Sequence, residues 1–214
     1  MKISVFLLMF IISLSSCRKE NFTKPKSKIV AKSSEDKYFG VDTLLIKRYT
    51  SDSGNEIELR GSESKDLFFV NVKTKSGKYY NYQIADSWYA ASHSQIEWDN
   101  SEFVFIRQGC GTVCWNGKVL NITGRKKTQD LLFYLYCDSI KSYVAFVDSI
   151  DEKRLILKNL KSLRQTEINL DLCEEAVMPF LTIDTIFETS NNNLLIKYNA
   201  KNCRDKKEKL VKLP

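Results

Sequence analysis

The stretch LFFVNVKTKSGKYYNYQI (67–84) decides the fold class of this 214-residue chain. Its two halves are rich in Val, Ile, Phe and Tyr, the residue types that fit a pleated, half-buried strand. Tyr80, Tyr82 and Ile84 alternate with other residues and therefore share one strand face, which we expect to lie in the core. The polar segment between the halves contains Gly77, so the sequence predicts a β-hairpin.

Similar short apolar runs recur from about Tyr38 onward, separated by clusters of Asn, Asp, Gly and Ser. The clearest are residues 102–108, 118–122, 131–137, 142–148, 154–159, 166–170, 182–188, 193–199 and 208–213. No segment shows a long 3.6-residue period, and only 173–181 is expected to form a helical turn, before Pro179. We therefore predict an all-β fold.

The runs also suggest a weak internal repeat. Residues 142–170 and 182–213 share one order of strand, polar turn, strand, longer polar turn and strand. A spacing of about 40 residues with several strands per unit is typical of propeller blades. We expect an antiparallel meander with hairpin repeats of about 40 residues, arranged either as a propeller or as an open, sandwich-like β fold.

The N-terminal residues MKISVFLLMFIISLSSC (1–17) have the layout of a secretory signal. Lys2 precedes an apolar stretch, Ile3–Ile12, and small residues lead to Cys17. The apolar stretch is shorter than the roughly 20 residues that a membrane-spanning helix needs. An ordinary signal peptide cut at another position is the alternative.

Leu14-Ser15-Ser16-Cys17 also resembles the bacterial lipobox. The resemblance implies that residues 1–16 are removed and that Cys17 becomes an acylated N-terminus that holds the protein to a membrane. Such lipoproteins are retained in the inner membrane when Asp follows the cysteine. Arg18 stands here, so the resemblance implies an outer-membrane lipoprotein that faces the periplasm or the cell surface.

The composition after the signal indicates a tether followed by one domain. Residues 17–37 are polar and rich in Lys and Ser, which predicts a flexible tether, and 38–214 are expected to form a single all-β domain. The formal charge of +7 lies at the ends, with +4 in 18–37 and +4 in 201–214. Because the middle is nearly neutral, we expect no nucleic-acid partner. The basic ends are either solvated or close to envelope phosphates.

Apart from Cys17 the chain has five cysteines: Cys110, Cys114, Cys137, Cys173 and Cys203. Export places them in an oxidising compartment, where disulfides are expected, and the odd number leaves at least one unpaired within the chain. Several pairings are open. We expect Cys110–Cys114 and Cys173–Cys203, with Cys137 as a buried free thiol. A redox pair or a metal site at Cys110 and Cys114 is less favoured, because the redox spacing and further ligands are missing.

Candidate catalytic residues are few. His93, the only histidine, is expected in a surface loop, and the sequence contains no nucleophile elbow, phosphate loop or dinucleotide fingerprint. Two carboxylate pairs, Glu97 with Asp99 and Asp148 with Asp151, lie at expected strand ends, where acids are common. We expect no cofactor and no metal.

The sequence therefore favours a membrane-anchored envelope lipoprotein with a non-catalytic binding or scaffolding role. Its partner would be an envelope protein, glycan or lipid. Trp88, Tyr89 and Trp115 are the candidate binding surface, because exposed aromatics stack on sugars or anchor proteins; the alternative is that they close the core. The competing functions are a hydrolase of envelope polymers and an inhibitor of an envelope-attacking enzyme.

Overall fold

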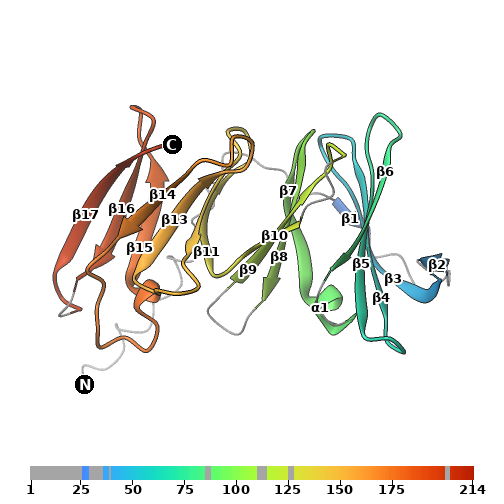
Figure 1. The fold of residues 1–214 in the computed structure, drawn as a ribbon, viewed down its shortest axis with the longest axis horizontal. Helices are drawn as coiled ribbons and strands as arrows, with labels where there is room; N and C mark the ends of the chain where they lie inside the picture. The colour runs from blue at the N-terminus through green and yellow to red at the C-terminus, as the bar shows by residue number, and fades with distance from the viewer. Residues whose placement is uncertain are drawn as a thin grey trace, which may run out of the picture. The chain divides into compact units, whose positions relative to one another are not determined.

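A computed structural model describes residues 26–28, 36–38, 40–84, 88–109, 115–124, 128–200 and 203–214. Within these ranges the chain is nearly all antiparallel β-structure, which confirms the predicted fold class (Figure 1). The chain divides into two compact units, of which one lies within 21–131 and the other contains 132–214. Each unit is described by itself below.

The unit within 21–131 contains two meander sheets. The strands of the first sheet are β1 (Lys26–Lys28), β2 (Asp36–Tyr38), β3 (Val41–Thr50), β4 (Glu56–Ser62), β5 (Leu67–Lys73) and β6 (Tyr79–Ile84). Those of the second sheet are β7 (Ser94–Asp99), β8 (Phe103–Gly109), β9 (Trp115–Asn121) and β10 (Thr128–Leu131). From β3 on, sequential strands are neighbours in each sheet, as expected for a meander.

Strand β1 and the first two residues of β2 lie in 17–37, the segment that the sequence assigned to a tether. Both strands pair with β3. The backbone of these six residues therefore belongs to the first sheet. The other residues of the predicted tether lie outside the described part of the chain.

The hairpin predicted at 67–84 is confirmed. β5 pairs with β6 in register, with Asn71 opposite Asn81 and Val72 opposite Tyr80. Gly77 has φ of +81° in the turn, a conformation that glycine adopts without steric cost. The amide of Gly77 donates to the carbonyl of Thr74 at 2.8 Å, which closes the turn.

One core holds the two sheets of this unit together. Tyr80, Tyr82 and Ile84 are buried on the inner face, as predicted, with inward residues of β3 to β5 and of β7 to β9. The helix α1 (Trp88–His93) lies at one end between the sheets and buries Ala91 in the same core (Figure 1).

Two polar contacts also link the sheets of this unit. The hydroxyl of Tyr82 on β6 donates to the carbonyl of Asn121 on β9 at 2.6 Å. At the turns, the Asp99 carboxylate accepts hydrogen bonds from Ser51, Ser53 and Asn55, with the Asn55 amide at 2.6 Å. One carboxylate therefore fixes the β3–β4 turn to the β7–β8 turn.

The unit that contains 132–214 is also built from two meander sheets. The strands of the first are β11 (Tyr134–Asp138), β12 (Tyr143–Val147), β13 (Arg154–Asn159) and β14 (Gln165–Asn169). A 3-10 helix, η1 (Pro179–Thr182), precedes the second sheet, β15 (Ile183–Glu188), β16 (Asn193–Asn199) and β17 (Lys206–Lys212). Inward residues of both sheets form one core, in which Phe180 stacks on Phe133 with ring centroids 4.4 Å apart.

Three local expectations were wrong. The apolar run 131–137 is not one strand, because β10 ends at Leu131 and Phe133 has φ of +44° in a turn before β11. The helical turn expected before Pro179 begins at Pro179 instead, since a proline is tolerated in the first turn of a helix. His93 ends α1 rather than lying in a loop.

Candidate functional site

Trp115, the predicted binding residue whose side chain is described, lies at the surface. It is the first residue of β9, pairs with Gly109 of β8, and is 40% exposed. A Cβ atom built on Gly109 would lie 3.4 Å from the indole ring of Trp115. A Cβ atom there would be in ordinary van der Waals contact with the ring, so the Trp115 ring lies directly beside the neighbouring strand.

Arg107 holds this ring from one side. Its guanidinium carbon lies 4.3 Å from the centroid of the Trp115 ring, a cation–π contact. Arg107 is fixed in turn by an ion pair with Glu97 at 3.3 Å and by donating to the Gln95 side-chain oxygen at 2.9 Å. We call these four residues the Trp115 cluster. Cross-strand register places Arg107 opposite Gln95, so the cluster is built on three adjacent strands.

The other two candidates, Trp88 and Tyr89, and the third tryptophan of the chain, Trp98, are placed differently. The side chains of Trp88 and Tyr89 lie outside the described part of the structure, although their backbone begins α1. Trp98 is 5% exposed and stacks on Phe105 with ring centroids 5.5 Å apart. Trp98 therefore belongs to the packed interior, while Trp115 is available at the surface.

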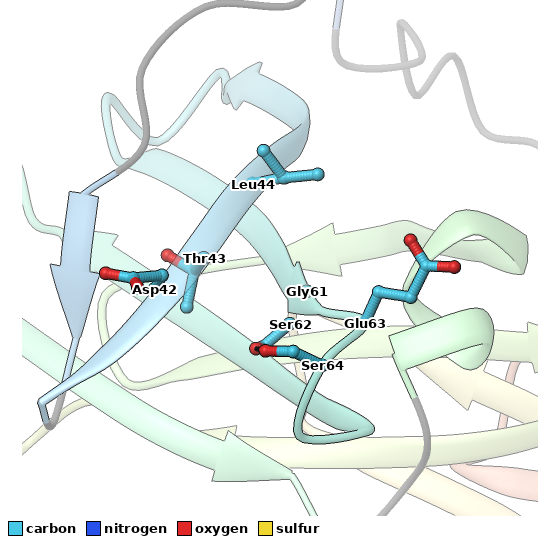
Figure 2. Close-up of a pocket in the computed structure, with 7 residues that line it drawn as sticks. All are labelled: Asp42, Thr43, Leu44, Gly61, Ser62, Glu63 and Ser64. Carbon is cyan, nitrogen blue, oxygen red and sulfur yellow. Dashed lines mark hydrogen bonds between the residues drawn. The ribbon is translucent and has the colours of Figure 1, made fainter.

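A pocket of about 400 Å³ lies where β3 begins and β4 ends (Figure 2). Its walls are Asp42, Thr43, Leu44, Gly61, Ser62, Glu63 and Ser64. Thr43 and Ser62 are buried, whereas the two carboxylates are exposed. The hydroxyl of Thr43 accepts a hydrogen bond from the buried Arg60 at 3.1 Å, which fixes the wall of the pocket. The hydroxyls and carboxylates of this wall can form hydrogen bonds with a polar ligand, and no histidine is among the lining residues. No motif in the sequence indicated this pocket.

The predicted carboxylate pairs serve structural contacts. Glu97 binds Arg107, and Asp99 joins the two turns described above. Asp148 forms an ion pair with Arg154 and accepts from the amide of Ile150 at 3.0 Å. These contacts explain why acids lie at the strand ends, and neither pair lines the pocket.

The large pKa shifts also belong to structural contacts. Burial raises the pKa of Tyr82 to about 12, and its hydroxyl bridges the two sheets. The hydrogen bond from Lys207 is the largest cause that lowers the pKa of Asp171 to about 2, and the Tyr198 hydroxyl contributes as a second donor. Perturbed pKa values often mark functional sites, but these groups lie in neither the Trp115 cluster nor the pocket.

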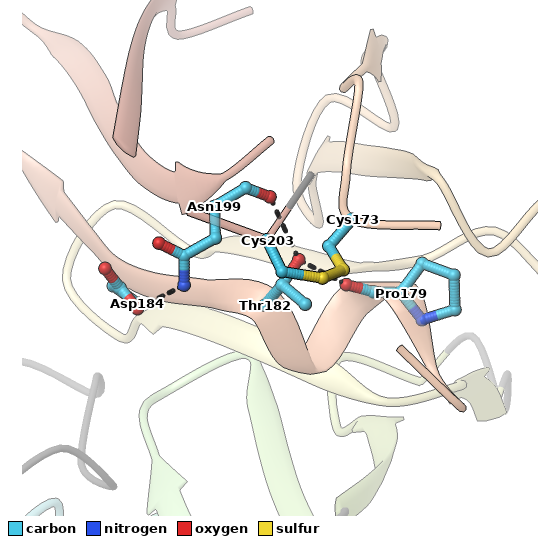
Figure 3. The surroundings of a disulfide bond; sticks show 6 residues. All are labelled: Cys173, Pro179, Thr182, Asp184, Asn199 and Cys203. Carbon is cyan, nitrogen blue, oxygen red and sulfur yellow. Dashed lines mark hydrogen bonds between the residues drawn. A yellow bond between two sulfur atoms is a disulfide. The ribbon is translucent and has the colours of Figure 1, made fainter. Parts of the chain in front are cut away.

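Cys173 and Cys203 form a disulfide, the pairing expected from the sequence (Figure 3). Their Cα atoms are 4.8 Å apart, and they are separated by 30 positions in the sequence. Cys173 follows β14 of one sheet, and Cys203 lies in the turn between β16 and β17 of the other. The disulfide therefore ties the two sheets of its unit, beside the hydrogen bond from the Cys173 amide to the Asn199 carbonyl at 3.1 Å.

The expectation for Cys137 was wrong, because this residue is disulfide-bonded rather than a free thiol. Its apolar neighbours on β11 suggested a buried thiol, and a sequence run does not reveal a covalent partner. Cys17, Cys110 and Cys114 lie outside the described residues. Over the described ranges, no group of three or more His, Cys, Asp or Glu side chains is placed to hold a metal ion.

No helix in the described part of the chain has the length and apolar character needed to cross a bilayer. The chain was also compared with known proteins. No family model, no curated protein and no solved structure matches it.

Proposed function

We propose that this chain is a membrane-anchored envelope lipoprotein with a non-catalytic binding role, and that the Trp115 cluster contacts a partner protein. The anchor rests on the resemblance of Leu14–Cys17 to a lipobox, which implies acylation of Cys17. The binding role rests on one observation, the half-exposed Trp115 ring held by Arg107.

The chemistry of the cluster favours a protein partner. Trp and Arg are the residue types that most often dominate the energy of protein interfaces. Because Glu97 and Gln95 already fix Arg107, its side chain loses little conformational freedom when a partner binds. A preorganised aromatic and cationic pair with a polar rim has the composition of an interface centre.

The anchor is tested by the intact mass of the protein extracted from its own membranes. We expect a chain that begins at Cys17 and carries acyl groups. A chain that lacks acyl groups would refute the anchor, whatever the result for binding.

The binding surface is tested by photo-cross-linking in intact cells, with the cross-linking residue placed at position 115. Phe187 is the control position, because it is 38% exposed with Lys197 Nζ 5.9 Å from its ring. We expect a discrete adduct from position 115 that disappears in Arg107→Gln and is absent from position 187. The same adduct pattern from both positions would refute the proposed surface.

A further inference from the structure

The outer face of the sheet β15–β17 carries a row of apolar side chains. The register places Phe187 of β15 opposite Leu195 of β16, and Leu195 opposite Leu210 of β17. Side chains directly opposite each other on neighbouring strands are in contact range, so these three form one strip, which we call the Phe187 row. The adjacent strand residues Ile196 and Val211 point to the other face, where they join the core of the unit.

The Phe187 row is open to solvent. Phe187 is 38% exposed, Leu210 is 59% exposed, and Leu195 between them is partly exposed. An antiparallel sheet that buries one face normally presents polar side chains on the other face. Single exposed apolar residues are common on soluble proteins, whereas a contiguous apolar strip marks a surface that contacts a protein or a membrane. The row therefore indicates an interaction surface.

Three lysines lie on the same face as the Phe187 row. Lys197 is next to the row on β16, where its Nζ is 5.9 Å from the centroid of the aromatic ring and 2.7 Å from the Glu208 carboxylate. Lys212 is next to the row on β17, and Lys206 lies toward the other end of that strand. Among the residues that the structure describes, neither Lys206 nor Lys212 forms an ion pair.

The carboxylates near this face do not neutralise those two lysines. Glu208 is engaged in the ion pair described above. Asp184 accepts a hydrogen bond from the side-chain amide of Asn199 at 3.5 Å, two rows away from the Phe187 row (Figure 3). Glu188, at the end of β15, forms an ion pair with Lys141 of the other sheet. The charge that lies directly beside the apolar row without a partner is therefore positive.

An apolar row flanked by lysines fits the surface of a bilayer with anionic headgroups. Apolar and aromatic side chains enter the interface, while lysine stems follow the apolar surface and bring the ammonium groups to the phosphates. A second copy of the chain would bring two positively charged faces together, which disfavours a symmetric dimer. The proposed anchor at Cys17 would keep a bilayer close to the domain, so the choice of a bilayer rests in part on the proposed function.

We propose that the outer face of β15–β17 docks on an anionic bilayer, with the Phe187 row inserted at the interface and with Lys206 and Lys212 bound to lipid phosphates. This surface shares no residue with the Trp115 cluster, so a partner protein and the membrane can be bound independently. It also gives the basic segment 201–214 a role at envelope phosphates rather than in solvent.

The test is sedimentation with lipid vesicles of the mature chain, residues 17–214, made with Cys17→Ser so that no acyl group contributes. We expect binding to vesicles of equal parts phosphatidylglycerol and phosphatidylcholine, and weaker binding to phosphatidylcholine alone. Phe187→Ser and Leu210→Ser should each weaken the binding by about fivefold, because each removes apolar area from the contact. Lys212→Gln should weaken it by about fivefold at low salt, because it removes one cation from the membrane surface.

Ile150→Ser and Lys65→Gln are the matched controls. Ile150 is 87% exposed in the turn between β12 and β13, and Lys65 is an exposed lysine in the turn between β4 and β5. Neither control variant should change the binding to vesicles. Leu210 is more exposed than Phe187, so Leu210→Ser keeps the test valid if Phe187→Ser does not fold.

The proposal is overturned if the unacylated chain binds neither kind of vesicle, or if binding survives both Leu210→Ser and Lys212→Gln. A dimer in light scattering that Leu210→Ser disrupts would also overturn it, since a second copy would then occupy this face. A discrete protein adduct from position 187 in intact cells would have the same effect. Because the test uses no acyl group, its failure is distinguishable from failure of the proposed anchor, which the intact mass decides.

Discussion

The disulfide between Cys173 and Cys203 should supply a large part of the stability of the unit that contains 132–214. The two residues are 30 positions apart, and the loop between them contains η1, β15 and β16. The chain-entropy relation for a loop of this length gives about 3.6 kcal/mol at 25 °C. We therefore expect Cys173→Ala/Cys203→Ser to lower the free energy of unfolding by about 3–4 kcal/mol. The double variant is preferred because a single one would leave a thiol free to exchange.

Urea unfolding followed by far-ultraviolet circular dichroism measures this loss. With a slope of about 1–3 kcal/mol per M, the midpoint should fall by more than about 1 M. All three tryptophans, at positions 88, 98 and 115, lie in the unit within 21–131, so their fluorescence reports that unit separately. A loss below about 1 kcal/mol in the circular dichroism transition would contradict the loop-entropy reasoning.

Three further predictions concern single polar groups. Tyr82→Phe removes the hydrogen bond to the Asn121 carbonyl and should cost about 1–2 kcal/mol of unfolding free energy in urea melts. Burial raises the pKa of Tyr82 to about 12, so the wild type should also lose stability as the pH rises from about 10 to about 12. An equally steep loss in Tyr82→Phe would show that ionisation of Tyr82 is not the cause. The hydrogen bond from Lys207 is the main cause that lowers the pKa of Asp171 to about 2. The contribution of Asp171 to the free energy of unfolding is therefore complete above about pH 4 and is lost as the pH falls through about 2. Asp171→Asn should flatten the stability profile over that acid range, and an unaltered profile would exclude the ion pair as its cause. Asn71→Leu replaces an unpaired buried amide by an apolar group of similar size and should raise the unfolding free energy by about 1–2 kcal/mol, whereas a loss in thermal melts would show that the amide is satisfied.

Strand positions were predictable from the sequence wherever apolar runs end in turn residues. The runs at 67–73, 154–159 and 193–199 coincide with β5, β13 and β16 residue by residue. Alternate residues of β16 are buried, whereas consecutive residues in the middle of β5 and β13 are buried, and in all three strands the buried residues, apart from Asn71, are apolar. The run at 131–137 failed because its turn uses Leu132 and Phe133, which carry no turn signal, and Phe133 is held by packing on Phe180.

The candidate site was only partly predictable. Trp115 was selected as an exposed aromatic, but Arg107, Glu97 and Gln95 join it through strand register, which short sequence motifs do not encode. The amide of Asn71, which lies outside this site, could not be found from sequence either, since it is unusual only because its neighbours leave it unpaired. The covalent state of Cys137 was missed for a related reason, because a disulfide depends on contacts between distant segments.

The Asp99 carboxylate has a consequence for how this protein can change over generations. Ser51, Ser53 and Asn55 all donate to one of its oxygens, so the four side chains form a single network with strongly non-additive energies. Replacing Asp99 alone removes the acceptor that the three donors share, although Ser51 can still donate to the Asn55 carbonyl and Asn55 to Ser53. Once this acceptor is lost, further changes among the donors should cost less than they do in the wild type. A mutational library that samples one position at a time should therefore record only losses here, and functional alternatives should appear only as combined replacements. Substitutions in the two turns are therefore expected to occur together during evolution, even though 44 positions separate Asp99 from Asn55, the last residue of the first turn.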